Sequence, residues 1–96
     1  MRILVAEDET IIRLDLREIL ERAGYAVVAE ARDGEEAVEL AASEKPDLAI
    51  LDVKMPKLDG IDAARRILTD RPIPIVILTA YGQDELVARA VEAGVF

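Results

Sequence analysis

The 96-residue chain contains no cysteine, no histidine and no tryptophan, and aromatic residues make up only 3% of it. Without cysteine it has neither disulfides nor thiolate metal ligands, and without histidine it has no imidazole base or imidazole zinc ligand. Any bound metal must therefore be a hard cation held by oxygen atoms. Its core must be built from aliphatic side chains.

Positive charge is also scarce, because 12 Lys and Arg face 20 Asp and Glu and give a net charge of −8. Binding to nucleic acid needs clusters of Lys and Arg, so we expect no nucleic-acid binding by this segment. No apolar run approaches the roughly 18 residues of a membrane span, and the N-terminus has no signal-peptide core. We therefore expect a cytoplasmic protein that does not associate with membranes.

The pattern of hydrophobic residues predicts one α/β domain. The composition, 52% hydrophobic and 33% charged, is typical of a folded protein of single-domain size. Short apolar runs alternate with segments of helical period, which is typical of βαβ units feeding a parallel sheet. The predicted strands are 2–6, 25–29, 48–51 and 75–78, and the predicted helices are 10–23, 34–44, 60–69 and 83–93.

Two helices carry further local signals. Helix 10–23 has an apolar face and is predicted to end at Gly24, which adopts a left-handed conformation easily. Asp33 is a predicted N-cap for helix 34–44. The side chains expected to face inward from helix 10–23 are Ile12, Leu16, Ile19, Leu20 and Ala23.

Carboxylates follow two of the predicted strands. Asp52 follows the apolar run 48–51, and Glu7-Asp8-Glu9 follows the run 3–6. In a parallel sheet such strand ends meet at one edge, so the carboxylates should converge and favour a divalent cation. The hydroxyl of Thr79 would lie beside Asp52 if the third and fourth strands are neighbours.

Together these segments resemble the receiver domain of bacterial response regulators, the CheY-like family. The resemblance covers the entire chain and is carried by residues 3–9, 51–56 with Asp59-Gly60, 78–80 and 93–94. It implies a doubly wound, flavodoxin-like parallel sheet of order 2-1-3-4. Helices 10–23 and 83–93 should then cover one face, and helices 34–44 and 60–69 the other.

The resemblance also implies a chemistry for the converging carboxylates. Asp52 is the expected phosphoacceptor, whose carboxylate would become an acyl phosphate. Glu7 and Asp8, with Asp52 and the backbone carbonyl of Lys54, are the expected Mg²⁺ ligands. Thr79 is expected to donate a hydrogen bond to the phosphoryl oxygens.

As a receiver, the chain would be a non-enzymatic switch in two-component signal transduction and would take its phosphoryl group from a sensor histidine kinase. Thr79 and Tyr81 are the expected switch residues. Residues 2–9, 61–64 and 78–81 further resemble receivers that precede an RNA-binding ANTAR antitermination domain. RNA binding and the regulation of transcription would then belong to a longer parent protein.

The chain departs from the family pattern in two ways. Glu7 stands where Asp is more usual, and the fifth strand with its Lys-Pro pair and the fifth helix are missing. We therefore expect 1–96 to be a receiver domain incomplete at its C-terminus, without the lysine that would pair with the acyl phosphate. Strand 75–78 would then be an exposed edge, through which we expect the chain to self-associate.

Two alternatives remain from the sequence. One is a degenerate receiver that acts only as a protein-interaction module. The other is a Mg²⁺-dependent phosphohydrolase, which would usually have a second Asp at the position of Lys54. Taken singly, Asp52 is better explained as a turn-capping acid, Thr79 as a strand former and Tyr81 as a packed surface ring.

Overall fold

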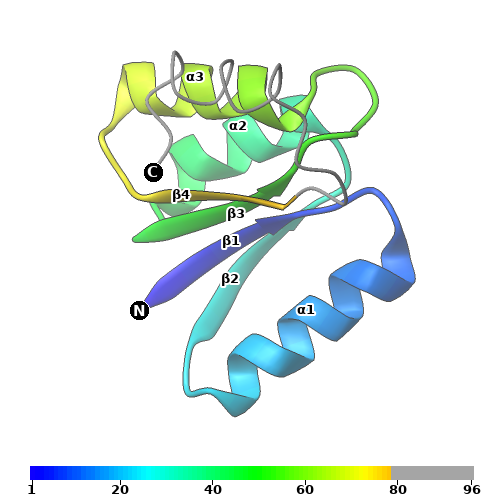
Figure 1. The fold of residues 1–96 in the computed structure, drawn as a ribbon. Coiled ribbons are helices and arrows are strands. Elements are labelled where there is room, and N and C mark those ends of the chain that lie inside the picture. Colours follow the sequence, from blue (N-terminus) through cyan, green and yellow to red (C-terminus); the bar gives the residue numbers. More distant parts are fainter. Residues whose placement is uncertain (79–96) are drawn as a thin grey trace.

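The protein forms a four-stranded parallel sheet of order β2-β1-β3-β4 with helices on both faces (Figure 1). The computed structural model describes residues 1–78, so Thr79, Tyr81 and the predicted helix 83–93 lie outside the described residues. The order confirms the doubly wound, flavodoxin-like arrangement. The elements are β1 (Arg2–Ala6), α1 (Thr10–Arg22), β2 (Ala26–Ala31), α2 (Gly34–Glu44), β3 (Leu48–Asp52), α3 (Gly60–Asp70) and β4 (Ile75–Leu78).

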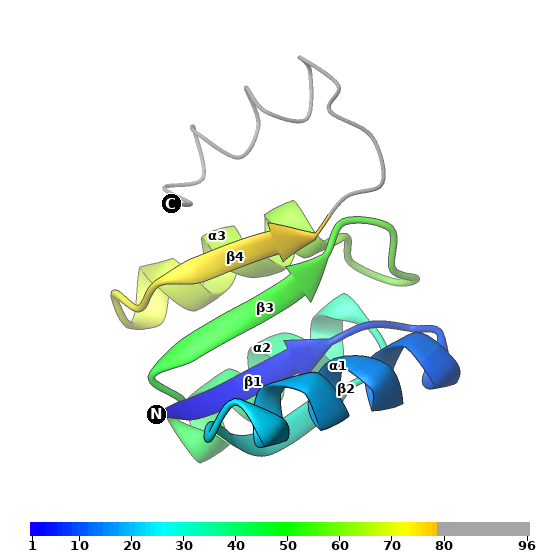
Figure 2. The same cartoon turned by 60° about the horizontal axis from the view of Figure 1, so that its bottom comes forward.

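Parallel pairing brings the carboxyl ends of all four strands to the same edge of the sheet (Figure 2). On β1 and β3, Ala6 pairs with Leu51. On β3 and β4, Asp52 pairs with Leu78. The residues that follow these strands therefore meet at one edge, as expected for an open α/β sheet.

The larger core lies between the sheet and the α2–α3 layer (Figure 1). Strand side chains alternate between the two faces of a sheet, and one of the two sets points into this layer. Small alanines on α2 and α3 let the helices approach the sheet closely. The fully buried members include Leu4, Ala6, Ala31, Ala37, Ala49, Leu51, Ala63, Ala64 and Ile75.

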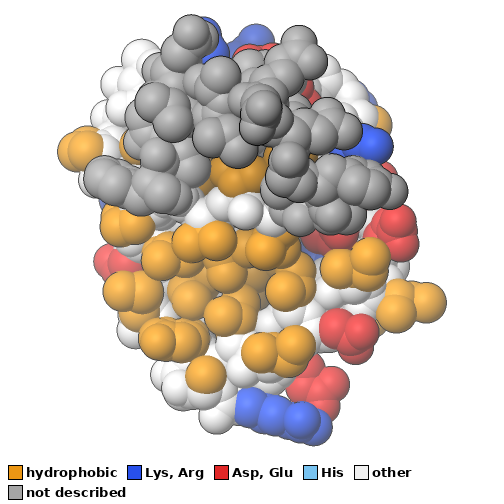
Figure 3. All heavy atoms as spheres, viewed as in Figure 1, with side chains coloured by type: hydrophobic (Ala, Val, Ile, Leu, Met, Phe, Trp, Pro, Cys, Tyr) orange, Lys and Arg blue, Asp and Glu red, His pale blue; other side chains and the backbone are white. Residues whose placement is uncertain are grey.

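The opposite face packs against α1. Ile3, Val5 and Ile50 form a smaller core there, against which Leu16 and Leu20 of α1 are packed. Hydrophobic side chains also gather on the surface of the side that carries α1 and β4 (Figure 3). Over the described residues as a whole, the large hydrophobic side chains that are exposed are Met1, Ile11, Ile12, Leu14, Ile19, Tyr25 and Val76.

The predicted inward face of α1 is partly wrong. Leu16 and Leu20 pack inward, but Ile12 is 41% and Ile19 61% exposed, and Ala23 is also exposed. Arg13, about one turn before Leu16, is buried instead, so the covered side of α1 includes this arginine. An arginine on the buried side was not anticipated from hydrophobic periodicity.

The element boundaries otherwise follow the sequence closely. β2 begins one residue later and ends two residues later than predicted, because Glu30 and Ala31 still pair with Val5 and Ala6. Gly24, after α1, has the predicted left-handed conformation at φ 93°. None of the helices within residues 1–78 is long and apolar enough to cross a membrane.

Candidate metal and phosphoacceptor site

The acidic residues meet because of strand register. Glu7 is the residue after β1, and Asp52 is the last residue of the neighbouring β3. The pairing of Ala6 with Leu51 makes Glu7 and Asp52 the next pair along the two strands. The Glu7 amide donates a hydrogen bond to the carbonyl of Ala31 (3.0 Å), which extends the β1–β2 ladder into the site.

Three carboxylates form a compact cluster at this edge. Glu7, Asp8 and Asp52 each offer a carboxylate oxygen, and these oxygens all lie within 4.8 Å of one another. Glu7 is only 5% exposed, Asp52 is half-buried and Asp8 is exposed. The cluster is therefore closed on the side of the sheet and open to solvent on the other.

The close approach of these groups changes the acidity of Glu7. Burial first, and then hydrogen bonding to the Asp8 and Asp52 carboxyls and the negative charge of Asp52, raise the pKa of Glu7 to about 7. The backbone N–H of Glu9, 3.5 Å from Glu7 Oε2, acts in the opposite direction. Without a cation the cluster thus holds more negative charge than its surroundings stabilise.

Two glycines let the chain after Asp52 pack tightly. A Cβ at Gly60, the first residue of α3, would lie 2.0 Å from the carbonyl oxygen of Asp52. A Cβ at Gly34, the first residue of α2, would lie 1.9 Å from the carbonyl oxygen of Leu58. Both contacts are far inside van der Waals distance, so only glycine fits either position with this backbone.

Helix caps and an ion pair hold the same loop. The Asp59 side chain accepts a hydrogen bond from the Asp62 amide (2.8 Å) at the start of α3, and Asp33 caps α2 through the Glu36 amide (2.8 Å) as predicted. Lys57 Nζ lies 3.8 Å from Asp33 Oδ2. The β3–α3 loop is thereby tied to the start of α2 as well as to α3.

The cluster suits a hard divalent cation. All its side-chain donors are carboxylate oxygens, the ligands that Mg²⁺ and Ca²⁺ take, and few enough are present to leave coordination positions for water or phosphoryl oxygens. A cation would also offset the burial and the negative charge of Asp52 that raise the pKa of Glu7. The residues present therefore fit the Mg²⁺ that the family resemblance implies.

Of the predicted site residues, the structure brings Glu7, Asp8 and Asp52 together. Lys54 lies in the β3–α3 loop, two residues after Asp52, and Thr79 directly follows Leu78, the β4 partner of Asp52. Arg13 was not predicted from the sequence as a site residue, yet its Nη1 donates a hydrogen bond to the backbone carbonyl of Glu7 (2.8 Å). The signal in the sequence that could have indicated this role is an arginine in the first turns of α1, shortly after the acidic residues 7–9.

The fold and the acidic edge are those of a receiver domain, and similarity to a known protein family agrees with this. Residues 3–96 match the response regulator receiver domain family, to which this chain belongs. The resemblance predicted from the sequence is thereby confirmed.

Similar proteins and structures span several bacteria. The transcriptional regulatory protein PdtaR of Mycobacterium tuberculosis is 60% identical over 93 residues, which are 97% of this chain and 45% of PdtaR. The chain thus spans about half the length of this curated relative. The response regulator domain of Thermotoga maritima CheB superposes with a TM-score of 0.92 at 32% identity and covers 99% of this chain and 73% of that domain. A chain of the CheX-CheY-BeF3-Mg²⁺ complex of Borrelia burgdorferi matches with a TM-score of 0.92 at 28% identity. This match covers 99% of the present chain and 73% of the chain in the complex.

Proposed function

We propose that the chain is a phosphoacceptor receiver, in which Asp52 accepts a phosphoryl group from the phosphohistidine of a sensor histidine kinase. An Asp52 carboxylate oxygen would attack phosphorus, the P–N bond would break, and the imidazole would leave with the electron pair and take up a proton. The product is an acyl phosphate on Asp52. The observation that carries this proposal is the half-buried Asp52 within a cluster of three carboxylates at the carboxyl edge of the sheet.

The reaction needs positive charge that this cluster lacks. Glu7, Asp8 and Asp52 would hold Mg²⁺, with the backbone carbonyl of Lys54 as a further ligand. When bound, the ion neutralises charge on the carboxylates and on the transferred phosphoryl oxygens. The similar CheY complex contains both BeF3 and Mg²⁺, which supports this assignment.

Switching would begin at the residue that follows β4. Because Leu78 pairs with Asp52, the next residue, Thr79, is our candidate donor of a hydrogen bond to the new phosphoryl oxygens. Tyr81, two residues later, is our candidate for passing that change to the surface.

The output would lie outside this chain. PdtaR, of which the match covers 45%, is a transcriptional regulatory protein, so we propose that a longer parent regulates transcription. An ANTAR domain there would bind RNA, whereas the segment itself, with its net charge of −8, would bind no nucleic acid. We place the protein in the cytoplasm as a signalling module without enzymatic turnover.

Intact mass spectrometry after incubation with acetyl phosphate and Mg²⁺ tests the proposal. We expect the chain to gain the mass of one phosphoryl group, and Asp52→Asn to abolish the gain. Asp47→Asn is the matched control, because Asp47 precedes β3 at the opposite end of the same strand and should leave the gain intact. If the chain gains no mass from acetyl phosphate or from a phosphorylated histidine kinase, the proposal is wrong and the chain is a degenerate receiver that acts as an interaction module.

A further inference from the structure

Arg13 is a buried cation next to the acidic cluster. It is 9% exposed, and together with Glu7 it makes up the buried charged residues within the described part of the chain. Burying a guanidinium costs several kcal/mol unless it is paired and hydrogen-bonded. A residue that only packed α1 onto the sheet would be apolar, as Leu16 and Leu20 are. The contacts of Arg13 therefore indicate what the charge does.

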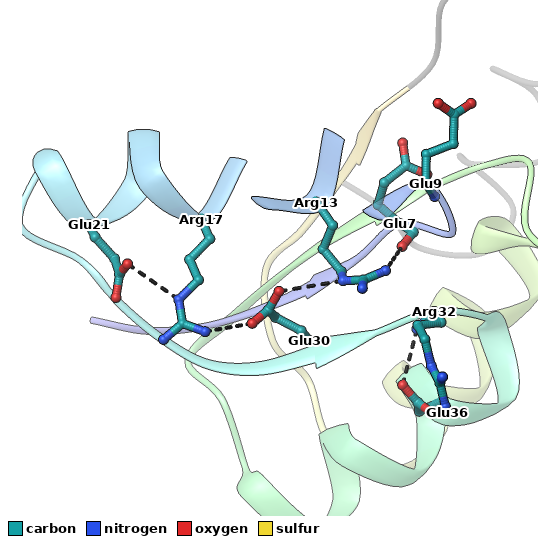
Figure 4. Close-up of polar contacts among 8 residues, drawn as sticks. All are labelled: Glu7, Glu9, Arg13, Arg17, Glu21, Glu30, Arg32 and Glu36. Atoms are coloured by element: carbon teal, nitrogen blue, oxygen red, sulfur yellow. Dashed lines mark hydrogen bonds and ion pairs between the residues drawn. The ribbon is translucent and has the colours of Figure 1, made fainter. Parts of the chain in front are cut away.

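The best-aligned contact of Arg13 leads to the acidic site. Its Nη1 donates a 2.8 Å hydrogen bond to the backbone carbonyl of Glu7 (Figure 4). Its Nε lies 3.4 Å from Glu30 Oε1 on β2, but this atom is buried and makes no hydrogen bond within the described residues. The guanidinium is thus oriented by the Glu7 carbonyl, while Glu30 supplies the compensating charge.

Glu30 is shared with a second arginine that does not contact the site. Arg17 Nη1 lies 2.6 Å from Glu30 Oε2, and Arg17 Nε lies 3.3 Å from Glu21 Oε1 (Figure 4). The Arg17 side chain is 42% exposed, whereas that of Arg13 is 11% exposed. The two arginines pair with the same carboxylate, but only the buried one contacts Glu7.

The backbone of Glu7 is consequently fixed on both sides. Its N–H donates to the carbonyl of Ala31 (3.0 Å), and its C=O accepts from Arg13. A peptide unit is planar, so holding the Glu7 carbonyl also holds the N and Cα of Asp8. Arg13 therefore constrains the peptide plane that carries the Asp8 Cα.

We propose that Arg13 is a positioning residue for the acidic cluster: by holding the Glu7 carbonyl, it fixes the peptide plane from which Asp8 projects toward Asp52, and so sets the affinity for a divalent cation. This inference rests on the proposed function, since it takes the cluster to be a Mg²⁺ site. Partners that orient metal ligands typically change metal affinity by about 10–100-fold when they are removed.

The test measures Mg²⁺ affinity by calorimetry on the 96-residue chain. Arg13→Met should raise the Kd by about tenfold or more, because Asp8 is no longer held in place. Arg17→Met is the matched control: it breaks an ion pair with the same Glu30 without touching Glu7, and should keep the Kd within about twofold of the wild-type value. Arg13→Lys keeps a donor for the Glu7 carbonyl and should restore part of the affinity.

A readout without metal separates this inference from the proposed function. In the Mg²⁺-free protein, the NMR order parameter of the Asp8 amide should fall in Arg13→Met and remain unchanged in Arg17→Met. An unchanged Kd and order parameter in Arg13→Met would overturn the inference alone. Absence of Mg²⁺ binding by the wild type would overturn the proposed metal site. If Arg13→Met does not fold, Arg13→Lys decides: a Kd raised by more than the twofold allowed for Arg17→Met, together with a lower Asp8 order parameter, supports the inference, and a Kd and order parameter no different from those of Arg17→Met contradict it.

Discussion

Glu7 stands at the buried end of a strand and carries a carboxyl group that two other carboxyls approach. Its peptide group is satisfied by Ala31 and Arg13, whereas its buried carboxyl group lies beside the carboxyl groups of Asp8 and Asp52. The backbone is thus stabilised while the side chain is not. At Glu7, the burial that comes with folding disfavours the ionised carboxylate that cation binding requires.

The raised pKa of Glu7 predicts a pH-dependent stability in Mg²⁺-free solution. The folded-state pKa is about 7 against an ordinary value of 4.5, so folding favours the protonated form. Its stabilising contribution is complete below about pH 4.5 and is lost as the pH rises through about 7. We expect denaturant unfolding to show a decrease of up to about 3 kcal/mol between these limits.

Glu7→Gln isolates this contribution from the other acids. The amide cannot ionise, so the difference in unfolding free energy between variant and wild type should grow in favour of the variant from pH 5 to pH 8. A difference that stays constant over this interval would contradict the assignment of the titration to Glu7.

Mg²⁺ should stabilise the folded chain through the same cluster. A ligand that binds only the folded state adds RT ln(1 + [L]/Kd), or about 1.4 kcal/mol at ten times the Kd. For a domain of this size we expect the melting temperature to rise by about 5–10 °C. Asp8→Ala should lose most of this rise, whereas the control Asp15→Ala, on the exposed side of α1, should retain it. An equal rise in both variants would exclude Asp8 as a ligand.

At the scale of elements, the β3–α3 loop is held by the helices on either side of it. Gly34 and Gly60 stand at equivalent places, the first residues of α2 and α3, and each meets a backbone carbonyl of the same chain segment. The carbonyl beside Gly60 belongs to Asp52, and the one beside Gly34 belongs to Leu58. Only the first contact reaches the proposed phosphoacceptor.

Replacing each of the two glycines by alanine should therefore have one effect in common and one that differs. Gly34→Ala and Gly60→Ala should both lower the unfolding free energy by about 1–3 kcal/mol, because each Cβ overlaps a backbone carbonyl. A decrease in unfolding free energy would be diagnostic of this overlap, since alanine in a helix is otherwise more stable than glycine by roughly 0.5–1 kcal/mol. Gly60→Ala should in addition weaken Mg²⁺ binding by displacing Asp52. Equal Mg²⁺ affinities in the two variants would show that the Gly60 contact does not position the site.

Most of this element-level architecture was predictable from the sequence, and the exceptions have a common cause. Strand positions follow from apolar runs, and the convergence of Glu7, Asp8 and Asp52 follows from where those runs end. Periodicity says only which side of a helix is apolar. It therefore placed Ile12 inward and gave no sign that Arg13 is buried, because that burial depends on a partner on another strand, Glu30. The close approach of Gly60 to Asp52 likewise depends on tertiary geometry.

On the scale of the whole molecule, the two faces of the sheet are covered unequally within residues 1–78. α2 and α3 pack over one face, whereas α1 alone packs over the other, near β1 and β2 (Figure 2). Val76 of β4 is 42% exposed on that second face, where its β3 partner Ile50 also points. Within the described residues, β4 pairs with β3 on one side only.

This asymmetry predicts self-association of the 96-residue chain through β4. An edge strand offers free backbone donors and acceptors to a second copy, and an exposed apolar side chain adds a hydrophobic contact. Light scattering coupled to gel filtration should report a dimer or larger species, and Val76→Lys should shift it to a monomer, since a charge on an edge strand blocks pairing. Ile12→Lys, which places the same charge on the exposed side of α1, is the control and should leave the assembly intact. A monomeric wild-type chain would show that the β4 edge is not an interface, and dissociation by Ile12→Lys alone would move the interface to α1.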